Sequence, residues 1–296
     1  MTTPVTKEAS TKELPEVTYH TPFPMAGEAC VEGGMVYRLA GRREALLFRR
    51  YADDLDGFTL RHNNHETLVW EKRLPNEASH LIKVFSIFHD ATPGELYDLM
   101  QDAVFREEWD TFRLEAYRVA RLDAANDIGY YAARSPLPFV ANRDFVNQRM
   151  WHDAGRGEYV IFNTSVPHPA VPPGERCVRA VSMLTGYFFQ PWVNPRTGEV
   201  DGTAFTYLTH VDPRGSIPKT LMNYVTTKFA PKTIKKVGKA LKRFKVWLPA
   251  QLEAGGYVRD WVKEPEWWVS PEEEAANPIR NITIDFAKEK MKGIVN

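Results

Sequence analysis

The chain has 296 residues, of which 43% are hydrophobic and 12% aromatic, so it can bury a large core. Its 38 basic and 38 acidic side chains balance, which removes any global electrostatic case for binding nucleic acid. The two cysteines, Cys30 and Cys177, lack CxxC spacing and favour free thiols in a reducing compartment. No signal-peptide core and no membrane-spanning run is found, so the sequence predicts a cytoplasmic protein.

The N-terminal third contains two predicted helices. Residues 1–35 are rich in Thr, Pro and Glu and are predicted to form a flexible tail. A helical pattern then runs from residue 42 to about residue 56. A second helix is predicted to begin at residues 92–95, because TPGE is a capping box with proline at the first helical position. Residues 106–110 are placed at the continuation of this helix.

Strands dominate the middle of the chain. Runs rich in β-branched and aromatic residues predict strands at 68–72, 80–88, 128–134, 143–151, 158–164, 177–190 and 203–211. The helical period returns from Ile217 to about Ala250, with an expected kink at Pro231. A tryptophan-containing extension, residues 253–296, follows. These elements alone predict an α+β protein with an antiparallel sheet.

Several motifs recur in one order over about two hundred residues, longer than a chance match to one domain would span. They are FREEWD at 105–110, GYYAARSPLPFVANRDF at 129–145, VRAVSMLTGY at 178–187, YLTHVDPRGSIPK at 207–219 and MNYVTTKFAPKTIKKVGKAL at 222–241. Together they resemble the START (StAR-related lipid transfer) domain family, in its phosphatidylcholine transfer branch. The resemblance implies that residues 36–252 form a helix-grip fold, a curved antiparallel sheet wrapped around a long C-terminal helix with an internal lipid cavity.

The RxxxD motif is the main candidate for a head-group site. Arg106 and Asp110 stand four residues apart and can pair on one helix face, where an arbitrary pair of this kind is usually an exposed salt bridge. In the phosphatidylcholine-binding branch, this arginine lies in the cavity and meets the lipid phosphate. The resemblance therefore implies that Arg106 binds the phosphate and that Asp110 holds the guanidinium when lipid is absent.

Aromatic rings surround the choline group in that branch of the family. Alignment of the motifs places Tyr131 and Phe145 at two such positions, and each ring could instead serve core packing. Met183 and Leu208 fall at two others, where the phosphatidylcholine-specific member has tyrosines. This departure implies a looser pocket that accepts phosphatidylethanolamine as well as phosphatidylcholine, or another lipid.

A basic segment is the candidate membrane surface. Ten Lys and Arg residues and no acidic residue lie between Asp212 and Glu253. A helix face that is simply exposed to solvent would show the same composition. We expect the helix to meet an anionic membrane through Lys228, Lys232, Lys235, Lys236 and Lys239. In the loop at 135–142, Leu137, Phe139 and Val140 are expected to form an apolar wedge.

The function indicated by this reading is non-enzymatic transfer of one glycerophospholipid between membranes, with the lipid as cargo and no other cofactor. The alternatives are a lipid sensor that acts through a protein partner, or a START-type carrier of sterol or ceramide. An enzyme with Asp110 as base ranks last, because Arg106 should lower the pKa of that carboxyl. The histidines lack the spacing of a metal site.

Overall fold

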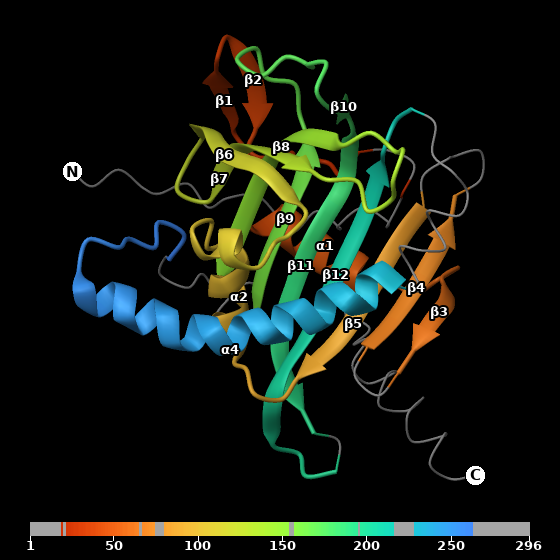
Figure 1. Cartoon of the computed structure of the whole chain (residues 1–296), viewed down its shortest axis with the longest axis vertical. Helices are drawn as coiled ribbons and strands as arrows, with labels where there is room; N and C mark the ends of the chain where they lie inside the picture. The colour runs from red at the N-terminus through yellow and green to blue at the C-terminus, as the bar shows by residue number, and fades with distance from the viewer. Residues whose placement is uncertain are drawn as a thin grey trace, which may run out of the picture.

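The computed structural model describes residues 19, 22–64, 67–74, 80–153, 157–194, 196–215 and 228–262. Its centre is a large antiparallel sheet (Figure 1). In spatial order the strands are β3 (Thr59–Asn63), β4 (Thr67–Arg73), β5 (His80–Phe88), β12 (Val200–Asp212), β11 (Val181–Val193), β9 (Tyr159–Ser165), β8 (Arg143–Asp153), β7 (Asn126–Ala133) and β6 (Arg113–Arg121). The short β10 (Val178–Arg179) pairs in parallel with β8, and β1 (Ala29–Glu32) and β2 (Met35–Arg38) form a separate hairpin.

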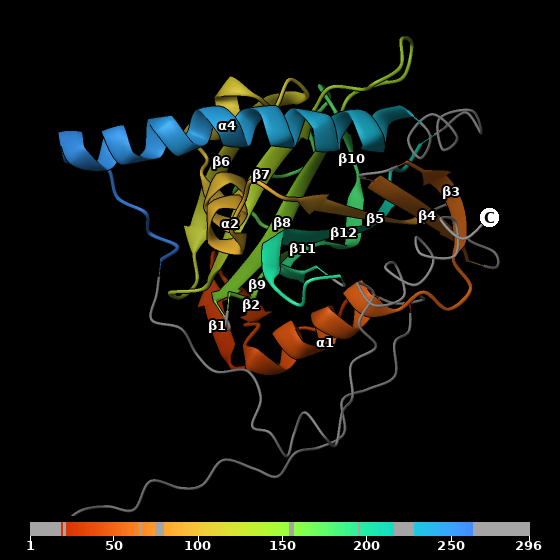
Figure 2. The same ribbon diagram turned by 90° about the horizontal axis from the view of Figure 1, so that it is seen from below.

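Helices cover both faces of the sheet. Figure 2 shows the sheet between α4 (Ala230–Ala254) on one side and α1 (Arg42–Asp53) on the other. Helix α2 (Pro93–Gln101) lies on the side of α4. It begins at the predicted capping box, in which the hydroxyl of Thr92 and the carboxylate of Glu95 each accept a backbone N–H. Among the described residues, none of the helices is long and apolar enough to cross a bilayer. The predicted α+β fold, with a mostly antiparallel sheet and a long C-terminal helix, is confirmed.

Strand alternation divides the sheet into an inner face toward α4 and an outer face toward α1. On β11, Phe189 packs into the cluster that contains the buried side of α4, whereas Leu184 and Phe188 pack into the cluster around α1. Gly186, between them, has no room for a side chain, since a Cβ atom there would lie 2.6 Å from the ring of Phe48 on α1. Each face therefore has its own apolar core.

Two sequence predictions about these elements need correction. Tyr19 and Phe23 are buried in the outer-face core and β1 and β2 are regular, so these parts of residues 1–35 are not a flexible tail. Pro231 does not kink α4, because the helix begins at Ala230 and proline fits its first turn. The predicted start at Ile217 and most of the C-terminal extension lie outside the described residues.

Lys83 is fully buried on the outer face, an unusual place for a lysine. Its ammonium donates to the backbone carbonyl of Tyr51, at 2.9 Å, and to that of Asp54, so it caps the C-terminal end of α1. It also lies 4.6 Å from the centroid of the Phe58 ring. Burial lowers the pKa of Lys83 to about 7, although Asp54 and Asp53 oppose the shift.

This buried lysine should make stability depend on pH. An unfolded lysine titrates near 10.5, so between about pH 7 and that value the unfolded state binds more protons, and stability rises with pH. At about 1.4 kcal/mol per pKa unit, the free energy of unfolding should rise by a few kcal/mol across the window. Urea unfolding of the wild type and Lys83→Met at several pH values measures this, because the variant should lack the rise. The control is Lys242→Met on α4, whose side chain is exposed; parallel curves for wild type and Lys83→Met would contradict the assignment.

Candidate functional site

Arg106 and Asp110 lie just after α2, around a short 3-10 helix, Phe105–Glu108, and not on a continuation of α2 as predicted. The side chain of Asp102 starts this turn by accepting a hydrogen bond from the backbone N–H of Phe105 at 2.7 Å. The backbone N–H of Asp110 donates to the carbonyl of Arg106 at 2.9 Å, which keeps the two side chains one turn apart. The ring of Phe105 packs against α4 and fixes the turn to that helix.

The predicted pairing of the two side chains is present. Nε of Arg106 donates to Oδ2 of Asp110 at 3.0 Å, and the hydroxyl of Tyr131 on β7 donates to the same oxygen, also at 3.0 Å. The guanidinium lies 5.3 Å from the ring centroid of Trp109 and 5.9 Å from that of Tyr131. The side chain of Arg106 is 24% exposed, so the pair holds the guanidinium and leaves part of it accessible.

Both members of the pair stay charged. Burial opposes the charge of Arg106, but the nearby oxygens of Tyr187, Asp110 and Tyr131 outweigh it and raise the pKa of the guanidinium. Burial also opposes the charge of Asp110, but Arg106 and the hydrogen bonds to its carboxylate outweigh it and lower its pKa. Burial, with a contribution from Asp110, raises the pKa of Tyr131, so its hydroxyl keeps the proton that it donates.

The other predicted lipid-binding residues differ in position. Phe145 on β8 stands directly opposite Tyr131 in the strand register, so the two rings share the inner face. Met183 is half-buried and lies at a bulge of β11, where the register with β12 shifts. The prediction that Leu208 contacts the lipid is wrong, because its side chain is fully buried in the outer-face core around α1. A difference of one residue along a strand moves a side chain to the opposite face.

Two tyrosines that the sequence analysis did not assign also belong to this site. Tyr187 and Tyr207 are register partners on β11 and β12, with ring centroids 5.0 Å apart and planes at 22°. Both side chains interact electrostatically with Arg106. Burial, followed by the proximity of Tyr187, raises the pKa of Tyr207. Both tyrosines lie in motifs of the sequence: Tyr187 ends VRAVSMLTGY, and Tyr207 begins YLTHVDPRGSIPK. The alternation of side chains along a strand is the signal that could have assigned them to the inner face.

The inner face of the central strands is more accessible than the outer face, although α4 covers it. On β11, Thr185 and Tyr187 are half-buried, whereas their neighbours Leu184 and Phe188 are buried. Several inner-face residues on the adjacent strands are likewise half-buried; they include Asn147, Asn163, Ser165, Tyr207 and Thr209. Several of these are polar and bond each other, as in the pairs Thr185–Thr209 and Asn147–Ser165. This pattern shows that part of the inner face is accessible and polar, unlike a dry, close-packed core.

A second group of charges lies at the edge of this inner face. Asp127 on β7 has no exposed surface and accepts hydrogen bonds from Arg149 on β8, at 2.7 and 2.5 Å, and from Arg118 on β6, at 2.9 Å. Asp260, beyond α4, pairs with Arg118 at 2.6 Å and with Arg121 at 3.0 Å. Burial opposes the charge of Asp260, but Arg118 and Arg121 outweigh it and lower the pKa of the carboxyl. The sequence analysis did not find this group.

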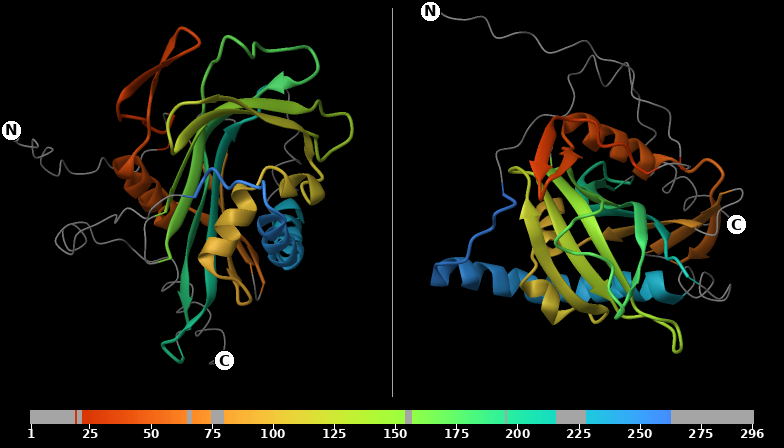
Figure 3. Two further views of the ribbon diagram at one scale, coloured as in Figure 1. Left: turned by 90° about the vertical axis from the view of Figure 1, so that its left-hand side faces the viewer. Right: turned by 90° about the horizontal axis from the view of Figure 1, so that it is seen from above.

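Residues 255–262, which we call the C-terminal latch, tie the end of α4 to α2 (Figure 3). Asp98 on α2 accepts a hydrogen bond from Nη1 of Arg259 and another from Nε1 of Trp261, both at 2.7 Å. Tyr257 donates to Asp102, and the Trp261 side chain is buried in the inner-face core. Trp261 is thus part of the folded domain, which extends past the predicted boundary at residue 252.

Comparisons with known proteins agree with this architecture. A model of the START domain matches residues 44–246. Human START domain-containing protein 10 is 36% identical over 201 residues, which cover 68% of this chain and 66% of that protein. The chain thus spans slightly less than two thirds of the length of that relative. Bovine (Bos taurus) phosphatidylcholine transfer protein is 25% identical over 166 residues, which cover 55% of this chain and 74% of that protein.

Solved structures show the same fold. A crystal structure of human STARD10 matches with a TM-score of 0.67 and 32% identity, covering 80% of this chain and 91% of that chain. Human StAR-related lipid transfer protein 5 matches with a TM-score of 0.58 and 20% identity, covering 68% of this chain and 94% of that chain, which is a likeness of fold alone.

Replacing the carboxylate at the centre of the site should destabilise the lipid-free protein. Asp110→Asn leaves the partly buried Arg106 without its counter-charge, and we expect a loss of about 3 kcal/mol at most, because part of the guanidinium is accessible. The folded-state pKa of Asp110 is lowered, so this stabilisation is present above the ordinary value of 3.8 and disappears as the pH falls below it. Urea unfolding of delipidated wild type and variant at neutral and acidic pH measures both effects.

Tyr131→Phe is the matched control, since it removes one hydrogen bond to the same carboxylate and leaves both charges. It should cost about 1 kcal/mol. Equal stability of Asp110→Asn and the wild type at neutral pH would show that the pair does not compensate the arginine.

Proposed function

The chain belongs to the START domain family, and we propose that it is a non-enzymatic carrier that binds one glycerophospholipid between its sheet and α4 and transfers it between membranes. The observation that carries this proposal is the accessible, partly polar inner face with one compensated arginine, Arg106. A packed core would not need either feature. The relative named phosphatidylcholine transfer protein supports phosphatidylcholine as one cargo, and phosphatidylethanolamine is the second cargo proposed.

In this proposal Arg106 binds the lipid phosphate through the guanidinium nitrogens that do not face Asp110, while Asp110 and Tyr131 keep the group in position. Aromatic faces are available for the ammonium of the head group. Trp109 and Tyr131 flank the guanidinium, and Phe145 shares the face of Tyr131. The stacked pair of Tyr187 and Tyr207 adds two rings, so the site is richer in aromatic residues than Met183 and Leu208 implied.

Membrane contact is proposed through the loop between β7 and β8 and the start of α4. The ring of Phe139 is completely exposed and its backbone has φ 64°, a strained conformation for a bulky residue. Leu137 and Val140 flank it and are half-buried. The loop projects on the same side of the sheet as α4 (Figure 2). Exposed lysines lie on this helix, at Lys232, Lys235 and Lys239, and just before it, at Lys228. Lys236 differs, because its ammonium contacts the hydroxyl of Thr111 at 2.5 Å and lies 5.0 Å from the ring centroid of Phe112.

The carrier is proposed to work in the cytoplasm, where it meets membranes transiently; the two unpaired cysteines favour that compartment. An enzymatic role for Asp110 is disfavoured, because its lowered pKa makes it a weak base at neutral pH. The sensor alternative now rests on Trp267 and Trp268, which lie outside the described residues, since Trp261 belongs to the core. A truncation that tests this alternative should therefore follow Val262 rather than Gly255.

Lipid uptake should depend on Arg106. The protein is incubated with vesicles of phosphatidylcholine and phosphatidylethanolamine, and the adduct is identified by native mass spectrometry. Arg106→Gln combined with Asp110→Asn removes both charges together, so no unpaired charge is buried, and uptake should fall about tenfold or more. Arg196→Ala, which removes an exposed arginine from the β11–β12 loop, should load like the wild type. Full loading of a folded double variant would reject the head-group site.

Vesicle binding should depend on the exposed apolar loop and on charge. Phe139→Ser should weaken binding to phosphatidylserine-containing vesicles about tenfold or more, because a buried ring contributes about 1.5–3 kcal/mol. Changing Lys228, Lys232, Lys235 and Lys239 to Gln should remove up to about 1 kcal/mol each and reduce the salt dependence. Val193→Ser, at the exposed end of the β11–β12 hairpin, is the matched apolar control in vesicle co-sedimentation. Equal losses for Phe139→Ser and Val193→Ser would contradict the proposed contact.

A further inference from the structure

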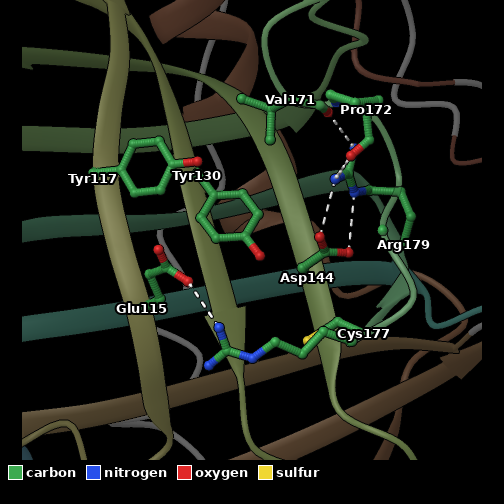
Figure 4. A pocket seen from close by; sticks show the side chains of 10 residues that line it. Glu115, Tyr117, Tyr130, Asp144, Val171, Pro172, Cys177 and Arg179 are labelled. Carbon is green, nitrogen blue, oxygen red and sulfur yellow. Dashed lines mark hydrogen bonds and ion pairs between the residues drawn. The ribbon is translucent and has the colours of Figure 1, made fainter.

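A small pocket lies on the outer face of the sheet, apart from the site of Arg106. It has a volume of about 140 Å³ and lies between the strands β6, β7 and β8 and the segment that leads into β10 (Figure 4). Tyr130, which lines it, is the neighbour of Tyr131 on β7, and strand alternation sends the two rings to opposite faces. Its volume is below that of ordinary small-molecule pockets, so it suits the end of one side chain.

Two tyrosine rings form one wall. Tyr117 and Tyr130 are register partners on β6 and β7, with centroids 5.0 Å apart and planes at 31°. Figure 4 shows the two rings side by side. Tyr117 is 47% exposed and Tyr130 is half-buried, so solvent reaches the pair. Burial, followed by Asp144, raises the pKa of Tyr130 to about 12 and keeps its phenol neutral. An exposed pair of ring faces attracts a cation.

The two carboxylates of the pocket are paired very differently. Asp144 is 4% exposed and accepts two hydrogen bonds from Arg179, both at 3.0 Å, so its charge is compensated. Glu115 is 46% exposed and, among the described residues, has a single ionic contact, Nη1 of Arg176 at 3.6 Å. That distance exceeds a good hydrogen bond, and the Arg176 side chain is 76% exposed. Such a pair is weak and easily exchanged.

We propose that this pocket binds the arginine or lysine side chain of a partner protein, in place of Arg176. The chain's own arginine at the carboxylate of Glu115 indicates the chemistry that the pocket accepts. The two rings offer their faces to the alkyl stem and charge of such a side chain, and Glu115 supplies the counter-charge. A phospholipid head group is a poorer fit, since its phosphate would lie beside Glu115, whose charge is only weakly paired.

The probe is the blocked tripeptide Gly-Arg-Gly, with Gly-Gln-Gly as its neutral counterpart, titrated into the full chain. Ring resonances of ¹³C-labelled tyrosine report binding at Tyr117 and Tyr130. Arg176→Ala removes the internal competitor and should strengthen Gly-Arg-Gly binding roughly two- to fivefold. Glu115→Gln should weaken it about tenfold. Arg214→Ala removes an arginine that is 60% exposed and paired with Asp212, and should bind like the wild type.

The outcomes separate the alternatives. Opposite effects of Arg176→Ala and Glu115→Gln, with no response to Gly-Gln-Gly, support the proposal. Absence of any shift in Arg176→Ala, or equal binding by Glu115→Gln, overturns it. Phosphocholine that shifts the same resonances more strongly than Gly-Arg-Gly also overturns it, in favour of a membrane head group. Phospholipid uptake by Glu115→Gln should stay at the wild-type level, because Glu115 lies on the face opposite Arg106.

Discussion

A guanidinium inside a protein must be compensated whether or not a ligand is bound, and this requirement organises the structure around Arg106. Asp110 supplies the opposite charge, and Tyr131 holds that carboxylate from the sheet. The pair forms where the chain leaves α2 at Asp102 and turns at once into a 3-10 helix, which keeps Asp110 one turn away from Arg106. Phe105 then fixes the turn to α4. Sheet, turn and helix thus meet at one ion pair.

Strand alternation gives the sheet two independent surfaces. The inner face holds half-buried polar and aromatic side chains, and the outer face is closed by α1 and by the hairpin of β1 and β2. Tyr130 and Tyr131 are adjacent in sequence, yet Tyr130 lines the small pocket beside Glu115 and Tyr131 lies at Arg106. Because successive side chains point to opposite faces, changes at one surface leave the other in place.

The sequence predicted features that depend on local chemistry. The capping box at Thr92, the spacing of Arg106 and Asp110 and the β-branched runs of the long strands are all local signals, and the structure has each of them. Leu208 was misplaced because successive residues of a strand point to opposite faces, so an assignment that is off by one residue takes Leu208 in place of its neighbour Tyr207. Trp261 was read as part of an extension because its partner, Asp98, lies far away in sequence. Contacts of that kind leave no periodic pattern in the chain.

Internal compensation also bears on how a carrier releases its cargo. If Arg106 were unpaired in the empty protein, lipid binding would remove the whole cost of a buried charge and release would be slow. Asp110 removes most of that cost beforehand, so in the proposed carrier a lipid phosphate would gain only the difference between two compensated states. The hydroxyl pair Thr185–Thr209 acts in the same way, since its members bond each other. When the polar groups that line a lipid site are already paired in the lipid-free protein, the affinity for lipid is moderate. Moderate affinity suits exchange between membranes better than permanent retention.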